Sequence, residues 1–404
     1  MKVALYHPWI YLRSGVERWM VELITRSRHD WTVYTHHYEP EATYPELAAL
    51  PIVPLEPEVS VRRSLGPLVH ATSTLLRARL PDDGSQALLV SSEGLGDLIA
   101  LRAAVPVAAY CHTPLKILHD PAASSIVRRS TTRRLAVRTI GPAFEAADRA
   151  AWRRYQHVFA NSTETRDRIH RARLRPRGPV EVLEPGVNPS WWEGPIVHDR
   201  APLLLYAGRI MWQKDVELAI DTVRLLGDEA RLVVAGMVDE KSRPYLEELR
   251  ARAAGLPVTF EIAPPDERLR ELYRTATALL FPARNEDFGM VVLEAMSAGT
   301  PVLAVDAGGP RTTVEHGVTG WLLPSSAEAF AAQVRELLRS DLRTHRVAAR
   351  AAAQRHGWEA HVARIDEVLE QLASGKQGGK LPRGIGPRAA GRGNDPGRGR
   401  EGAA

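Results

Sequence analysis

Short apolar runs alternate with amphipathic stretches along most of this chain of 404 residues. An apolar run of about 4–8 residues is typical of a buried strand, and apolar residues three or four apart are typical of one helix face. Strands that alternate with helices predict parallel sheets with helices on both faces. In the first half of the chain the predicted strands are residues 2–6, 87–91, 105–110 and 157–160, and residues 16–26 are a predicted helix.

The second half repeats this pattern more regularly, so the sequence predicts an α/β protein with two doubly wound, Rossmann-like domains. The turn-forming residues at 185–189 are the predicted hinge between them. The predicted strands are 203–207, 231–235, 258–261, 278–281 and 301–305, and the predicted helices are 215–226, 243–254, 266–275 and 289–298.

Composition favours a soluble globular protein, with 44% hydrophobic and 25% charged residues. The single cysteine, Cys111, cannot form an internal disulfide and fits a reducing compartment. The apolar run at residues 2–6 is too short for a signal peptide, and no uncharged apolar run approaches the ~18 residues that span a bilayer. We therefore expect a cytoplasmic protein, which can still bind the inner face of the membrane peripherally.

Charge is distributed unevenly along the chain. Residues 1–200 hold 26 Lys and Arg against 21 Asp and Glu, whereas residues 201–373 hold 20 against 25. Residues 374–404 contain ten glycines and no aromatic residue, which predicts a disordered basic tail. Basic segments of this kind favour an anionic membrane or nucleic acid as partner. A merely solvated tail is the alternative.

Ligands of doubly wound domains bind at the carboxyl ends of the strands, so the residues that follow strands are the informative ones. The strand at 278–281 is followed by Glu286, Asp287 and Gly289, and then by a helix that carries Glu294. A glycine lets backbone approach a ligand, and a helix N-terminus binds anions. Glu286 and Glu294 are eight residues apart, which is ~12 Å along a helix. This separation is larger than that between the two catalytic carboxyl groups of a glycosidase. We expect separate contacts to one long ligand; helix capping by Glu286 or Asp287 is the alternative.

Cations follow the strand at 203–207. Gly208 ends that strand, and Arg209 and Lys214 lie five residues apart before the next helix. Arg binds phosphate with two hydrogen bonds and Lys adds a compact charge, so the pair predicts a diphosphate site. Two solvated surface cations are the alternative.

Further candidates follow other strands: His112 in the string CHTP, Gly15 before the first helix, and Gly308-Gly309. Each has a structural alternative, as a buried histidine or a plain turn. No G-x-G-x-x-G follows any of the predicted strands, which argues against a dinucleotide cofactor. His7 and His112 lack partners at ligand spacing, so no metal is expected.

The strings LLLYAGRIMWQKD, ALLFPARNEDFGMVVLEAMSAGTPVLAVDAGGP and EHGVTGWLL together resemble the family 4 retaining glycosyltransferases of the GT-B fold. The resemblance covers roughly residues 1–372. It places the Glu-x7-Glu motif of that family on Glu286 and Glu294, its cation pair on Arg209 and Lys214, and its cleft histidine on His112.

The resemblance also implies roles for these residues. Glu294 binds the donor ribose, Glu286 and His112 contact the donor sugar, and Arg209 and Lys214 stabilise the leaving diphosphate. Backbone N–H groups at Phe288, Gly289 and Met290, and the loop at Gly15, contact sugar and phosphate. The configuration at the anomeric carbon is retained, and neither a metal nor another cofactor is needed. Two departures affect these contacts: Ser14 stands where the family often has a second glycine, and residues 311–313 lack its frequent glutamate.

The strings HTP, EDFGMVVLEAM and GGP are most similar to GDP-mannose-dependent mannosyltransferases, with UDP-linked donors as the alternative. We therefore expect transfer of mannose from a nucleotide sugar to a glycan, a lipid-linked acceptor or a small molecule. Epimerases of the same architecture lack the Glu-x7-Glu string. A remote alternative is nucleic-acid binding through residues 128–138 and the tail, but aromatic and basic residues are not interleaved in the body, so no nucleic-acid partner is expected.

The predicted organisation has four parts. Residues 1–188 form an acceptor-side domain and residues 189–357 a donor domain. Residues 358–373 form a helix that packs back toward the first domain, and residues 374–404 are the disordered tail. The stretch 124–140 carries five arginines, namely Arg128, Arg129, Arg133, Arg134 and Arg138. That stretch is either a solvated helix face or a surface that docks on anionic lipid.

Overall fold

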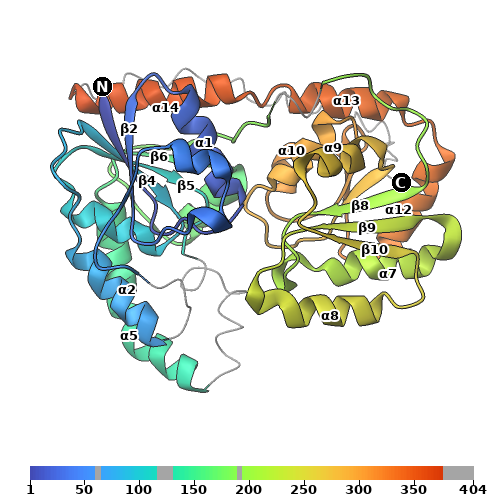
Figure 1. Cartoon of the computed structure of the whole chain (residues 1–404), viewed down its shortest axis with the longest axis horizontal. Helices are drawn as coiled ribbons and strands as arrows, with labels where there is room; N and C mark the ends of the chain where they lie inside the picture. The colour runs from blue at the N-terminus through green and yellow to red at the C-terminus, as the bar shows by residue number, and fades with distance from the viewer. Residues whose placement is uncertain (60–64, 116–130, 189–192, 376–404) are drawn as a thin grey trace, which may run out of the picture.

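The computed structural model describes residues 1–59, 65–115, 131–188 and 193–375. It contains two parallel sheets, one in each half of the chain (Figure 1). The first sheet has the strand order β3-β2-β1-β4-β5-β6-β7. Its strands are β1 (Lys2–Tyr6), β2 (Asp30–Thr35), β3 (Ile52–Pro54), β4 (Ala87–Ser92), β5 (Val107–Cys111), β6 (His157–Ala160) and β7 (Val180–Val182).

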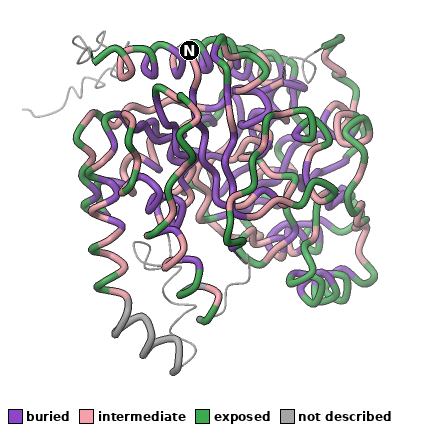
Figure 2. The backbone as a smooth tube through the Cα atoms, turned by 60° about the vertical axis from the view of Figure 1, so that its left-hand side comes forward, coloured by how far each residue is buried: buried purple, intermediate pink, exposed green. Residues whose placement is uncertain are grey.

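The second sheet has the order β10-β9-β8-β11-β12-β13. Its strands are β8 (Leu203–Ala207), β9 (Arg231–Gly236), β10 (Val258–Ile262), β11 (Ala278–Phe281), β12 (Val302–Val305) and β13 (Gly320–Leu323). Adjacent strands pair in parallel throughout, for example Leu204 with Leu232. The central strands are buried along their whole length, as expected for parallel strands with helices on both faces. Figure 2 shows this burial in the strands and exposure along the outer helices.

Helices connect successive strands in both domains. The first domain contains α1 (Gly15–Arg26), α2 (Leu65–Arg77), α5 (Thr131–Trp152) and α6 (Thr163–Arg171). The second contains α7 (Val216–Leu226), α8 (Arg243–Arg252), α9 (Asp266–Thr275), α10 (Met290–Ser297), α11 (Pro310–Thr313), α12 (Ala327–Arg339) and α13 (Arg343–Ala353). None of the described helices is long and apolar enough to span a membrane.

The last helix, α14 (Trp358–Ala373), returns to the first domain and lies along α1 (Figure 1). Trp358, Val362, Ile365 and Leu369 are buried in the same core as Trp19 of α1. The segment at 185–187, the predicted hinge, is buried beside the start of α14, where the N–H of Val187 donates to the carbonyl of His356 (2.9 Å). The two connections between the domains therefore run together.

Several predicted bounds were wrong for local reasons. The strand predicted at 105–110 starts at Val107, because Pro106 has no N–H to donate. Asp215 and Gly289 have left-handed backbone (φ 53° and 89°), so α7 and α10 each start one residue later than predicted. The prediction missed the short strands β3 and β7 at the sheet edges, and also β2 and β13. Residues 116–130, which include the first part of the arginine-rich stretch at 124–140, and the tail from 376 lie outside the described residues, and only the backbone is described for residues 131–140.

Candidate active site

The loop after β11, residues 282–289, meets the first domain at the carboxyl ends of its strands. Met290 starts α10 directly beneath Gly15: a Cβ added to Gly15 would lie 3.0 Å from the Met290 sulfur. Ser162, which follows β6, donates a hydrogen bond from its hydroxyl to the carbonyl of Asp287 (2.5 Å). The residues predicted from both halves of the sequence thus face one interdomain site.

Lys214 and Glu286 form an ion pair at this site. Lys214 ends a single 3-10 turn (Trp212–Lys214) after β8, and Glu286 lies in the loop after β11. Their side chains are 20% and 16% exposed, so neither is a solvated surface charge. Two groups predicted from separate strands therefore come together directly, and the surface alternative for Lys214 is wrong.

Gly308 and Gly309 pack against the backbone of the loop that carries Glu286. The N–H of Gly309 donates to the carbonyl of Glu286 (2.9 Å). A Cβ on Gly308 would lie 2.5 Å from that oxygen, and one on Gly309 would lie 2.4 Å from Phe288 backbone. Only glycine allows this approach, so these residues hold the carboxylate loop in place and are more than a plain turn.

Glu294 lies on α10 and accepts a hydrogen bond from the hydroxyl of Tyr273 on α9 (2.8 Å). Burial raises the pKa of Glu294, and the bond from Tyr273 and the charge of Arg18 oppose that shift. Glu286 and Glu294 therefore have different partners. Gly289, which has no side chain, directly precedes α10, and backbone amides at the start of a helix can bind an anion. Capping of α10 by Glu286 or Asp287 stays the alternative.

Arg209 lies beside a cavity of about 50 Å³ that both domains line, with Arg13 from the first domain and Met237 from the second. The backbone of Arg209 is fixed because its carbonyl accepts from the hydroxyl of Tyr206 (2.8 Å). Arg209 thus sits at the domain boundary while Lys214 contacts Glu286. A larger cavity of about 210 Å³, next to Arg200 and Arg346, contains none of the predicted site residues.

His112 is half-buried after β5, and its Nε2 lies 3.1 Å from the hydroxyl of Ser91. Burial lowers the pKa of His112 well below its ordinary value, and the nearby histidines His7 and His361 lower it further. The imidazole is therefore neutral near pH 7, which suits a hydrogen bond to a sugar hydroxyl. Within the described ranges, no three His, Cys, Asp or Glu side chains gather as a possible metal site.

The first turn of α1 carries a buried carboxylate, Glu17, to which the sequence analysis gave no role. Ser14 caps α1 and donates to Glu17, which is 3% exposed. Burial, with a smaller contribution from the charge of Glu93, raises the pKa of Glu17 to about 7, although the bond from Ser14 and the charge of Arg209 oppose the shift. The S-x-x-E spacing of a capping box was the available signal.

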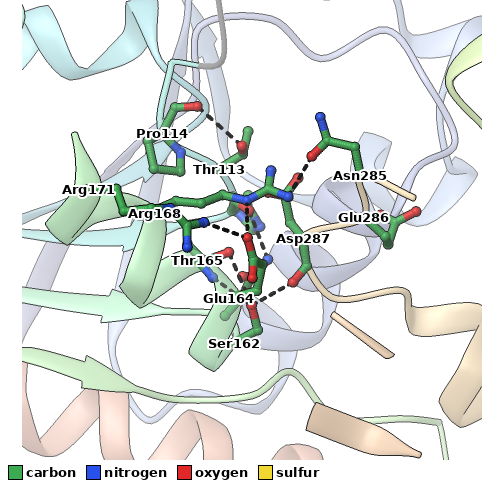
Figure 3. A network of polar contacts seen from close by, with 12 residues as sticks. Thr113, Pro114, Ser162, Glu164, Thr165, Arg168, Arg171, Asn285, Glu286 and Asp287 are labelled. Atoms are coloured by element: carbon green, nitrogen blue, oxygen red, sulfur yellow. Dashed lines mark hydrogen bonds and ion pairs between the residues drawn. The ribbon is translucent and has the colours of Figure 1, made fainter. Parts of the chain in front are cut away.

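A second missed group is Arg168 on α6 (Figure 3). Its guanidinium donates to the carboxylate of Asp287 (2.8 Å) and to the side-chain oxygen of Asn285. Both acceptors belong to the loop that carries Glu286. Nothing local in the sequence indicates this contact, because the partners lie more than a hundred residues apart.

Family models match both halves of the chain. Residues 13–191 match "Glycosyltransferase Family 4", and residues 194–356 match "Glycosyl transferases group 1". The chain belongs to the family 4 glycosyltransferases. The family resemblance read from the motifs is thereby confirmed.

A D-inositol 3-phosphate glycosyltransferase of Xylanimonas cellulosilytica is 33% identical over 213 residues, which are 48% of this chain and 51% of that protein. The chain spans about half the length of the curated relatives it matches. Sucrose-phosphate synthase of Thermosynechococcus elongatus (TM-score 0.72, 20% identity) covers 93% of this chain with its whole length. Anabaena HepE in complex with UDP and glucose (TM-score 0.68, 20% identity) covers 92% in the same way. The predicted GT-B fold of two Rossmann-like domains is confirmed.

Proposed function

We propose that this protein is a retaining glycosyltransferase that takes a hexose from a nucleotide sugar bound between the two domains. The observation that supports this proposal most directly is the Lys214–Glu286 ion pair, which lies just before the start of α10. Cation, carboxylate and helix N-terminus converge where parallel strands end, which is where this fold class binds ligands. Glu294 lies on the same helix, placed to contact the far end of an elongated donor.

The arrangement supports a division of labour during transfer. Lys214 and Arg209 stabilise the charge that grows on the departing diphosphate, an interaction stronger in the transition state than in the ground state. Glu286 accepts hydrogen bonds from hydroxyls of the transferred sugar, and Glu294 does so from the ribose. Neutral His112 contacts the sugar near the anomeric carbon. The departing phosphate oxygen accepts the proton of the acceptor hydroxyl as the new glycosidic bond forms on the same face.

For the donor, the motif strings support GDP-mannose, and UDP-linked hexoses are the alternative. HepE, which shares the fold, was solved with UDP and glucose. For the acceptor, the name of the D-inositol 3-phosphate glycosyltransferase relative supports a small polar molecule. A glycan or a lipid-linked sugar is the other acceptor class.

A donor screen tests this function. The full chain is incubated with GDP-mannose, UDP-glucose, UDP-galactose or UDP-N-acetylglucosamine, and both thermal stability and nucleoside diphosphate release are measured. One donor is expected to raise the melting temperature, because a ligand that binds only the folded state stabilises it. The same donor should release its diphosphate slowly. If none of the sugar nucleotides stabilises the chain or is turned over, the proposal is wrong.

A further inference from the structure

We propose that Arg168 is a positioning residue that orients Glu286 from the opposite domain, so that the donor-sugar carboxylate is aligned only when the domains are together. This inference rests on the proposed function and adds a residue to it. Arg168 lies on α6 of the first domain, whereas Glu286 lies in the loop after β11 of the second.

The two residues that flank Glu286 both bind the same guanidinium. Asn285 and Asp287 accept hydrogen bonds from the two terminal nitrogens of Arg168. In Figure 3 both point toward Arg168, while Glu286 between them points away from it, toward its ion pair with Lys214. One planar group that fixes both neighbours also fixes the direction in which the middle side chain leaves the backbone.

Arg168 is itself held in place. Its Nε donates to Glu164 one turn earlier on α6 (2.8 Å). The side chains of Arg168 and Asp287 are 13% and 14% exposed, so water screens their ion pair only weakly. Contacts within α6 therefore fix the orientation of the Arg168 guanidinium that binds the loop of residues 285–287.

The start of α6 makes two more contacts with the same region. The hydroxyl of Ser162 donates to the carbonyl of Asp287 and accepts from the N–H of Thr165 (3.0 Å), so the helix cap also docks the loop. The hydroxyls of Thr163 and Thr312 lie 2.7 Å apart. Thr312 lies on α11, three residues after Gly309 of the double glycine that supports Glu286. The start of α6 thus contacts both segments that hold this carboxylate, and the contacts of Ser162 with Asp287 and of Thr163 with Thr312 cross the domain boundary.

The test compares Arg168→Ala, Arg168→Lys and Arg171→Ala in the full chain, with the donor found in the screen. Arg171 is on the same helix but is 62% exposed and pairs with Glu164, so its variant is the matched control. Arg168→Ala is expected to lower kcat by about 10- to 100-fold, the scale of a misplaced catalytic group. Calorimetric affinity for the free nucleoside diphosphate should stay unchanged, because that product does not contact the sugar-binding carboxylate. The kcat of Arg168→Lys should lie between those of the wild type and Arg168→Ala, because one ammonium group cannot bind both Asn285 and Asp287 with the geometry of a guanidinium.

A double-mutant cycle separates positioning from general destabilisation. Adding Asp287→Asn to Arg168→Ala should lower kcat little beyond the single variant, because both remove one interaction. Wild-type kcat in a folded Arg168→Ala, a loss of diphosphate affinity in step with kcat, or additive losses in the cycle would each overturn the positioning role. If the wild-type chain turns over none of the sugar nucleotides, the proposed function is wrong, and the positioning role that rests on it is wrong as well.

Discussion

Lys214 is paired with Glu286 in the free protein, so a bound diphosphate must compete with a carboxylate for the ammonium. We predict that Lys214→Ala lowers kcat by about 10² to 10³, the typical effect of losing one donor to developing negative charge. Lys241, an exposed lysine of the same domain, provides the control Lys241→Ala, which should keep wild-type kcat. Steady-state kinetics with the screened donor measures both. A folded Lys214→Ala variant with normal turnover would remove Lys214 from the mechanism.

Substitutions of Glu286 and Glu294 should have different effects on the binding of the nucleoside diphosphate. Glu294→Gln is predicted to weaken binding of the nucleoside diphosphate, because its carboxylate contacts the ribose in the proposed function. Glu286→Gln should lower kcat while leaving that binding near the wild-type value. Tyr273→Phe removes the hydroxyl that donates to Glu294 and should reproduce a weaker form of the Glu294→Gln defect. Calorimetry with the free diphosphate decides, and equal losses in both Gln variants would contradict separate roles.

Glu17 gives a pH prediction. Its folded-state pKa is about 7 against an ordinary 4.5, so the folded protein keeps a proton that the unfolded chain releases between those values. Its contribution to stability is therefore lost as pH rises from 4.5 to 7. Glu17→Gln cannot ionise and should raise the free energy of unfolding by about 1–3 kcal/mol at pH 8 but not at pH 4.5. Thermal melts at both pH values test this; an equal gain at both would show that ionisation is not the cause.

At the scale of elements, the sequence predicted those whose signals are local. The loop between β11 and α10 was anticipated because an apolar run, a glycine and acidic residues occur within a few positions. The strands β3 and β7 have three residues each, too few to show an apolar period. The docking of α6 on residues 285–287 joins segments that are distant in sequence, and tertiary contacts of that kind leave no periodic trace. The turn-forming residues of the predicted hinge gave no sign that residues 185–187 are buried beside Trp358, because that partner comes from the far end of the chain.

The helix α14 should stabilise the first domain, although it follows the second in sequence. Ile365 is fully buried against the α1 core, so Ile365→Ala should cost about 2–4 kcal/mol from the cavity it leaves. Val347 on α13 is 55% exposed, and Val347→Ala should cost little. Denaturant unfolding followed by tryptophan fluorescence is a suitable probe, because Trp19 and Trp358 lie in this core. Similar midpoints for the two variants would contradict the packing role of α14.

At the scale of the whole molecule, charge divides the chain into a basic first half, residues 1–200, and an acidic segment, residues 201–373, that a basic tail follows. In the proposed function the acceptor approaches the first domain and the donor occupies the second. A basic acceptor side favours an anionic partner, either a phosphorylated small molecule or the surface of a membrane that presents a lipid-linked sugar. The arginines at 128–138 belong to this basic half; residues 128–130 lie outside the described residues, and only the backbone is described for residues 131–138. The choice between the two acceptor classes therefore depends on a binding measurement.

A flotation assay with lipid vesicles distinguishes a lipid-linked acceptor from a phosphorylated small molecule. Each basic residue near an anionic surface contributes about 1 kcal/mol, and salt screens the attraction. If the acceptor is lipid-linked, the chain should float at low salt with vesicles that contain acidic phospholipid, and should be released at high salt. Neutralising Arg128, Arg129, Arg133 and Arg134 together should weaken this binding. Neutralising four exposed arginines of the acidic domain, Arg231, Arg243, Arg250 and Arg339, should not. A wild-type chain that stays in solution at low salt would instead favour the phosphorylated small molecule, because a soluble acceptor needs no docking surface.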